Sequence, residues 1–170
     1  MEKDKKGVWV KTAHGDLNGV YYTYEIRHDD ITEETIDIYA RTAGVNGAMG
    51  MVIDLEETNP AGWYNYHPEP LEHYTDAVIY EMHVRDFSID KSGNFCYKGR
   101  FLAFVEKGVI NAAGDKIGID HLKELGVTHV HLMPSFDYQT VDETRLNVPQ
   151  FNWGYDPQNF NCPEGSYSTN

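Results

Sequence analysis

The chain has 170 residues, with 27 acidic side chains against 14 basic ones and a formal net charge of −13 at pH 7. A complete (β/α)8 barrel needs about 250 residues, so the length excludes one and allows a single domain or parts of two. The acidic balance disfavours a nucleic acid as partner. No run of the roughly 18 apolar residues that a membrane span needs is present, so no membrane partner is expected either.

Residues 1–58 have the composition of an all-β segment. Side chains that are β-branched or aromatic gather in short runs, and Gly-Asp and Asn-Gly pairs typical of turns lie between them. The expected strands lie in residues 8–10, 19–26, 36–40 and 51–55. Residues 59–76 then carry three prolines, which favours an ordered linker over a helix or a central strand.

A strand, a helix and a second strand are expected after this linker. Ala77–Val84 reads as a strand, Ile117–Leu125 as a short helix ended by Gly126, and Val127–Met133 as another strand. A helical crossover between neighbouring strands implies that they pair in parallel. Residues 134–170 show no clear periodicity and are predicted to be a long loop.

Two groups of ionisable residues accompany these strands. His129 and His131 share one face of the second strand, but a metal site needs a third ligand that the sequence does not identify, so a structural role is favoured. Glu81, His83 and Arg85 alternate along the first strand. A network that pairs Arg85 with carboxylates is favoured over acid–base catalysis for this second group.

The run from Asn152 to Pro157 sets two aromatic rings and a carboxylate on a loop shaped by glycine and proline. Tyr155 could stack on the apolar face of a sugar ring, and its π-face could favour the positive charge of an oxocarbenium-like transition state. Asp156 could accept hydrogen bonds from sugar hydroxyl groups. The same run is equally typical of a packed loop that its rings anchor.

Several segments, taken together and in order, resemble type I pullulanases of the α-amylase family. They are residues 77–88, 118–130, 152–157 and 161–168. Residues 15–22 and 37–40 resemble the end of the carbohydrate-binding β-sandwich that precedes the barrel in this family. Ile38, Phe160 and Cys162 depart from the usual family residues, which concerns only local packing.

The resemblance implies an α/β fold with an incomplete (β/α)8 TIM barrel. Residues 77–170 would supply the first two strands and first helix of the barrel, and residues 1–58 the C-terminal strands of an all-β immunoglobulin-like sandwich, with 59–76 as the linker. Because a barrel closes only when each strand has two neighbours, such a chain is expected to be weakly stable alone.

The activity that the resemblance implies is hydrolysis of α-1,6-glucosidic bonds in pullulan, starch or glycogen-type glucans, with retention of configuration by two carboxyl groups. The family's catalytic carboxylates lie on later barrel strands, so no catalytic residue is assigned here and the chain alone is expected to be inactive. Tyr155 matches the ring at the floor of the cleavage subsite, Asp156 is its polar neighbour, and Trp153 is a weaker substrate-binding candidate. No cofactor is implied, and calcium binding by a longer parent protein stays open.

A second class of function remains possible from the residues: a non-catalytic glucan-binding protein that uses exposed rings without chemistry. Isoamylases and branching enzymes share the same domain plan, but residues 152–157 and 163–167 resemble pullulanases more closely. The charged residues 1–6 are not followed by an apolar run of signal-peptide length, which slightly favours a cytoplasmic location without deciding it.

Overall fold

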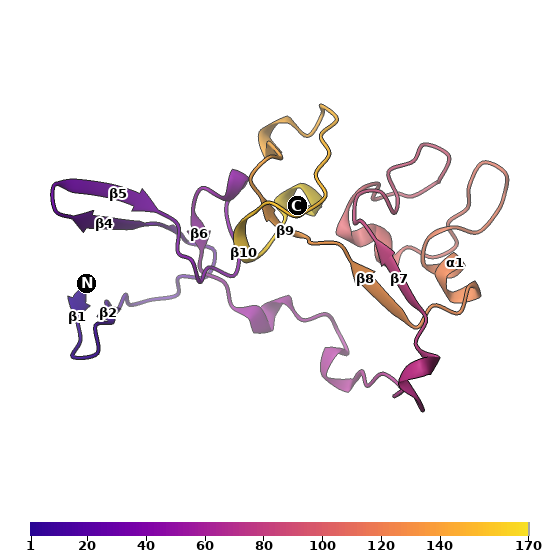
Figure 1. Ribbon diagram of the computed structural model, residues 1–170, viewed down its shortest axis with the longest axis horizontal. Coiled ribbons are helices and arrows are strands. Elements are labelled where there is room, and N and C mark those ends of the chain that lie inside the picture. The colour runs from indigo at the N-terminus through magenta and orange to yellow at the C-terminus, as the bar shows by residue number, and fades with distance from the viewer. Residues whose placement is uncertain (170) are drawn as a thin grey trace.

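The computed structural model describes residues 1–169. These residues form ten short strands, one α-helix and seven 3₁₀ helices. The chain is elongated: it runs from the N-terminal strands at one end to the α-helix at the other, and then returns to the centre, where the C-terminus lies (Figure 1). All of its sheets have two strands.

The N-terminal segment holds three antiparallel strand pairs. The pairs are β1 (Glu2–Lys3) with β2 (Trp9–Val10), β3 (Tyr21–Tyr22) with β6 (Gly50–Met51), and β4 (Tyr24–His28) with β5 (Ile31–Thr35). The expectation of strands at 36–40 and 51–55 is wrong apart from Met51, and the strand at 31–35 was not predicted. Because β5 is mostly polar and exposed, its sequence has no apolar alternation to reveal it.

The expected linker is extended and has no regular strand. A 3₁₀ helix at Leu55–Thr58 (η2) precedes it, and two more single turns lie within it, at Trp63–Asn65 (η3) and Tyr74–Asp76 (η4). Most of its side chains are exposed. This segment connects the N-terminal strand pairs to the parallel sheet along the lower edge of the molecule (Figure 1).

The expected strand–helix–strand unit is confirmed. Strands β7 (Ile79–Met82) and β8 (His129–Leu132) pair in parallel, and helix α1 (Gly118–Glu124) lies between them in the chain. Gly126 ends the helix with a positive φ of 74°, and the N–H groups of Gly126 and Val127 reach back to carbonyls of the last turn. This is the Schellman arrangement, in which glycine avoids the strain of a left-handed backbone.

Strand β7 is shorter than predicted, because the chain turns immediately after Met82. The N–H of Phe87 donates to the His83 carbonyl at 3.0 Å, and the N–H of Ile89 donates to the Arg85 carbonyl at 3.1 Å. His83 and Arg85 therefore do not lie on a strand face with Glu81, as the alternation suggested.

The prediction of a long loop after residue 134 is also wrong. The structure has strand β9 (Phe136–Tyr138), 3₁₀ helix η6 (Glu143–Arg145), strand β10 (Pro157–Pro163) and 3₁₀ helix η7 (Gly165–Tyr167). Strands β9 and β10 pair antiparallel with two register shifts. Such irregular pairing disturbs the alternation of inward and outward side chains, which removes the signal on which a sequence-based strand prediction depends.

Strands β9 and β10 pack against the end of the N-terminal segment. The Cys162 Sγ, which is fully buried, donates to the Ala40 carbonyl at 3.3 Å. The Asn159 side-chain amide donates to the Gly47 carbonyl at 3.1 Å, in the 3₁₀ helix η1 (Val45–Gly47). The two parts of the chain are thus joined by buried hydrogen bonds as well as by the linker.

Two small apolar clusters form the core around these elements. The first contains Val84, Tyr138, Val141 and Tyr167, with Phe101 and Phe104 packed against it. The second contains Phe95, Ala103 and Val109, with Phe87 and Ile117. The Phe87 and Phe104 rings stack at 4.5 Å, where the two clusters meet through 3₁₀ helix η5 (Phe101–Val105). Within residues 1–169, no helix is long and apolar enough to cross a membrane.

Candidate functional site

The loop at residues 152–157 connects η6 to β10 and presents two aromatic rings to solvent. Trp153 is 62% exposed and Tyr155 is 65% exposed. No ring contact of either residue is found in the part of the chain that the structure describes. The Tyr155 ring is thus largely exposed and does not pack against another aromatic ring, an arrangement compatible with a binding role.

Asp156 and Asn152, near the two ends of the loop, both form hydrogen bonds with Thr140. The Thr140 hydroxyl donates to Asp156 Oδ2 at 2.7 Å, and the side-chain amide of Asn152 donates to the Thr140 Oγ1 at 2.5 Å. One oxygen of Asp156 thus helps to hold the loop. If Asp156 accepts hydrogen bonds from a ligand, as predicted, the same carboxylate also accepts the structural hydrogen bond from Thr140.

Gly154 sets the conformation of the loop and its distance from the strand behind it. Its φ is +93°, and its N–H donates to Asn152 Oδ1 at 2.6 Å. A Cβ atom at this position would lie 2.0 Å from the carbonyl oxygen of Pro134. Only glycine fits both the left-handed backbone and this close approach. The loop therefore rests directly on the chain that follows β8.

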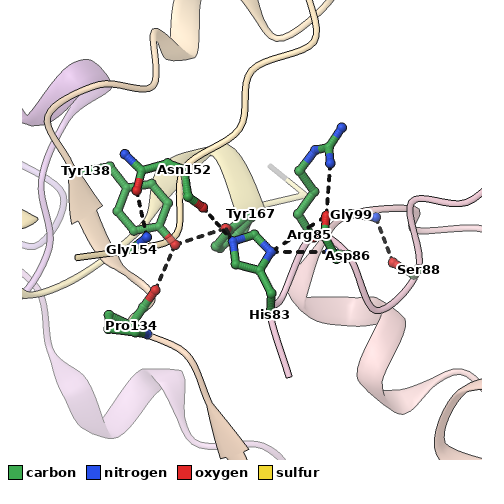
Figure 2. A network of polar contacts seen from close by, with 10 residues as sticks. All are labelled: His83, Arg85, Asp86, Ser88, Gly99, Pro134, Tyr138, Asn152, Gly154 and Tyr167. Carbon is green, nitrogen blue, oxygen red and sulfur yellow. Dashed lines mark hydrogen bonds and ion pairs between the residues drawn. The ribbon is translucent and has the colours of Figure 1, made fainter. Parts of the chain in front are cut away.

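A row of buried polar contacts supports the loop from below (Figure 2). His83 Nε2 lies 2.7 Å from the Asn152 carbonyl oxygen and 3.2 Å from the Tyr167 hydroxyl. The Tyr167 hydroxyl lies 2.9 Å from the Tyr138 hydroxyl, which donates to the Pro134 carbonyl at 2.8 Å. The sequence analysis did not connect His83 with this loop, because 69 residues separate it from Asn152 and no local pattern links them.

A half-open pocket of about 270 Å³ lies beside this row of contacts. Its polar lining includes Arg85, Lys98, Arg100, Asn152 and Tyr167. Trp153, Tyr155 and Asp156 do not line it, so the three predicted substrate-binding residues and the pocket are separate features, with Asn152 common to the loop and the pocket.

The two arginines of the pocket already donate hydrogen bonds to protein groups. The Arg85 guanidinium donates to Asp86 Oδ1 at 3.0 Å, which confirms the predicted pairing of this arginine with a carboxylate. Arg100 donates to the Ser166 carbonyl and, at 3.0 Å, to the Ser168 carbonyl. The Arg100 contacts tie the start of η5 to the C-terminal residues, whereas the Arg85–Asp86 contact stays within the turn after β7.

The two histidines of β8 take part in separate local contacts. His131 Nδ1 lies 3.8 Å from Glu81 Oε1 on the neighbouring strand, and both side chains are exposed. His129 Nδ1 lies 2.8 Å from the Thr128 hydroxyl. These contacts agree with the structural role that was favoured for the pair.

A cluster of three acidic residues, which the sequence analysis missed, lies where β9, η6 and η7 meet. Carboxylate oxygens of Asp137, Glu143 and Glu164 are all within 4.8 Å of one another. Oxygen ligands at this spacing suit a hard cation such as Ca²⁺. All three carboxylates, however, already accept hydrogen bonds from protein N–H groups. Asn159 donates to Asp137, Asn46 donates to Glu143, and Tyr138 and Ser166 donate to Glu164. Because these hydrogen bonds account for the placement of the three carboxylates, we interpret the cluster as structural.

The comparisons with known proteins agree with this geometry. No protein-family model matches the chain. A pullulanase of Bacillus subtilis is 41% identical over 173 residues, which cover 100% of this chain and 23% of that protein. A crystal structure of a pullulanase from Paenibacillus barengoltzii superposes with a TM-score of 0.95 and 48% identity, over 99% of this chain and 26% of that one. Over its whole length, the chain matches a segment of pullulanases.

A second solved structure, a pullulanase from an Anoxybacillus species, matches with a TM-score of 0.91 and 40% identity over 99% of the chain. The chain thus spans about a quarter of the length of these pullulanases. Pullulanases are debranching glycoside hydrolases, as the resemblance of residues 77–88, 118–130 and 152–157 suggested.

Stability of this pullulanase segment is expected to fall as the pH rises above the ordinary carboxyl range. Burial, and secondarily the charge of Glu143, raises the pKa of both Asp137 and Glu164 above the ordinary value. A carboxyl group with a raised pKa in the folded state favours folding when protonated. Its contribution is complete below the pKa of the unfolded chain, and it is lost as the pH rises through the folded-state pKa.

Urea unfolding between pH 4 and pH 7 measures this effect. Replacing Glu143 by glutamine removes the neighbouring charge and keeps a side-chain oxygen for the Asn46 N–H. The variant is therefore expected to lose less stability than the unsubstituted chain over this pH interval. Parallel pH profiles for the two proteins would show that the charge of Glu143 does not contribute to the dependence.

Proposed function

We propose that the chain is part of an enzyme that cleaves α-1,6-glucosidic bonds in pullulan, starch or glycogen-type glucans. The proposal is supported by the full-length match to proteins named pullulanase. It is also supported by the ligands of matched structures: the Paenibacillus barengoltzii protein was crystallised with maltohexaose and α-cyclodextrin, and the Anoxybacillus protein with maltotriose. An α-glucan is accordingly the proposed partner.

Residues 77–170 are proposed to begin a (β/α)8 barrel, and residues 1–58 to end an immunoglobulin-like β-sandwich, with 59–76 as the linker. The parallel pair β7–β8 with α1 between its strands supports the first assignment. Apolar side chains on both faces of this pair are exposed, and they include Ile79, Tyr80, Val130 and Leu132. Barrel strands have neighbours at both edges and cover on both faces, so these surfaces suit strands of a larger barrel.

The proposed reaction is a retaining hydrolysis, which needs two carboxyl groups about 5 Å apart on opposite sides of the scissile bond. The acidic cluster of Asp137, Glu143 and Glu164 does not suit this chemistry, because its oxygens accept internal hydrogen bonds beneath the surface. We therefore place the catalytic pair on barrel strands other than β7 and β8, and expect no hydrolysis by this chain alone. Release of reducing ends from pullulan by the chain would contradict that placement.

The chain's own contribution is proposed to be a sugar-binding loop. Tyr155 is the platform for a glucose ring, Asp156 its hydrogen-bonding neighbour, and Trp153 a weaker contact. The observation that carries this assignment is the combination of an exposed Tyr155 ring with a loop fixed by Gly154 and Asn152. A loop that is fixed before binding loses little conformational entropy when a ligand stacks on a ring that it carries.

Replacing Tyr155 by alanine is expected to weaken maltotriose binding about tenfold, because removal of a stacking ring costs on the order of 1–2 kcal/mol. Titration of the 170-residue chain with maltotriose, followed by NMR, measures the change. The matched control is Tyr66→Ala, which removes a ring that is 72% exposed and lies in the linker. Equal losses in both variants would contradict the assignment of the site.

A further inference from the structure

Only one assignment of donors and acceptors fits the hydrogen bonds around His83. A backbone carbonyl can only accept, so the contact of 2.7 Å with the Asn152 oxygen requires a proton on His83 Nε2. The N–H of Asp86 points at His83 Nδ1 with a separation of 3.3 Å, whereas the nearest Asp86 carboxylate oxygen lies 3.9 Å away, beyond hydrogen-bond distance. Nδ1 is therefore the acceptor and carries no proton. The imidazole is therefore neutral and in its Nε2–H form.

The direction continues through the two tyrosines. Because the Pro134 carbonyl can only accept, the Tyr138 hydroxyl donates to it and accepts from the Tyr167 hydroxyl. The Tyr167 oxygen in turn accepts from His83 Nε2–H, which is shared with the Asn152 carbonyl. Burial raises the pKa of Tyr138 to about 12 and raises that of Tyr167 well above its ordinary value, so both hydroxyls keep their protons at neutral pH.

This chain of bonds reaches the loop at two points. At one end, His83 holds the Asn152 carbonyl directly. At the other end, Tyr138 holds the Pro134 carbonyl, which is the oxygen on which Gly154 rests. The Phe151 ring, at the start of the loop, lies 5.3 Å from the His83 ring. One buried side chain thus controls the placement of residues on both sides of Trp153.

We infer that His83 is the positioning residue of the sugar-binding loop, which it fixes as a neutral Nε2–H imidazole through Asn152 and, by way of Tyr167 and Tyr138, through Pro134. His83 itself does not touch the ligand. The inference deepens the proposed function, but only its ligand-binding readout depends on that function. The tautomer and the order of the loop are properties of the free chain.

The first measurement is the side-chain nitrogen spectrum of the ¹⁵N-labelled 170-residue chain. The His83 signals, assigned by their loss in His83→Gln, are expected to show a protonated Nε2 and an unprotonated Nδ1. The Nδ1–H form, or the averaged signals of a mobile ring in an unfolded chain, would overturn the inference.

The second measurement compares two replacements of the histidine by hydrogen exchange of the Gly154 amide. Glutamine places an amide nitrogen near the position of Nε2 and keeps a donor for Asn152, whereas leucine fills the space without one. His83→Leu is expected to speed Gly154 exchange about tenfold, because the buried carbonyl loses its donor, and His83→Gln is expected to restore protection. If the amides of β4 and β5 exchanged faster by the same factor in His83→Leu, the variant would be generally unfolded. That result would contradict a positioning role of His83.

The third measurement separates this inference from the proposed function. Tyr167→Phe keeps the ring in the core but breaks the chain of hydroxyls, so it is expected to loosen Gly154 less than His83→Leu does. In maltotriose titrations, His83→Leu should bind about tenfold more weakly than His83→Gln. If the unsubstituted chain does not bind maltotriose, the proposed sugar-binding role of the loop fails, while the tautomer and exchange results still decide the role of His83.

Discussion

Replacing Gly154 by alanine is expected to destabilise the chain by about 2–5 kcal/mol, through two separate effects. A left-handed backbone costs a non-glycine residue roughly 1–2 kcal/mol. The new Cβ would also lie 2.0 Å from the Pro134 carbonyl oxygen, and because this is a backbone atom, it cannot move aside as a flexible side chain would. Relief of the clash requires a shift of the loop, which costs roughly a further 1–3 kcal/mol. Urea unfolding followed by circular dichroism measures the loss.

Gly114→Ala is the matched control for this experiment. Gly114 has a φ of +89°, close to the +93° of Gly154, but a Cβ there would meet nothing within 4 Å. The control therefore carries the backbone strain without the clash, and its expected cost is about 1–2 kcal/mol. A loss as large as that of Gly154→Ala would show that the contact with Pro134 is not what holds the loop.

The strand–helix–strand unit was predictable because its signals are local. The spacing of Ile119 and Leu122 and the position of Gly126 depend on neighbours within one or two helical turns, and tertiary packing did not override them. Strand β5 and the pair β9–β10 had no such signal. The first is polar and exposed, and the second is interrupted by register shifts that only long-range pairing reveals.

The candidate site shows the same division. Residue types predicted a loop shaped by Gly154 and Pro157 that carries Trp153 and Tyr155, but they left packing and ligand binding equally open, and the family resemblance supplied the binding assignment. What supports the loop was not visible in the sequence. His83 reaches Asn152 only because the chain turns immediately after β7, and that turn replaced two positions of the predicted strand. Sequence patterns thus predicted the exposed loop, and the structure was needed to find the contacts that support it.

Replacing Glu164 by alanine is expected to destabilise the chain by about 3 kcal/mol. Glu164 is 1% exposed, and its carboxylate accepts the N–H of Tyr138 at 2.7 Å and that of Ser166 at 3.0 Å. Alanine leaves both donors without this acceptor and opens a cavity, and each unpaired buried group costs roughly 1–3 kcal/mol. Loss of a negative charge beside Asp137 and Glu143 offsets part of this cost. The midpoint of urea unfolding measures the net effect.

Glu106→Ala separates burial from hydrogen bonding in this comparison. Glu106 also accepts two backbone N–H groups, those of Cys96 and Tyr97, both at 2.8 Å, but its surroundings are more exposed. Water can replace an exposed acceptor, so this variant is expected to lose about 1 kcal/mol or less. Glu164→Gln, which keeps one acceptor oxygen and removes the charge, should fall between the two alanine variants. Equal losses for Glu164→Ala and Glu106→Ala would mean that Glu164 contributes its two hydrogen bonds alone, and that its burial beneath β9 and η7 adds nothing to the stability of the fold.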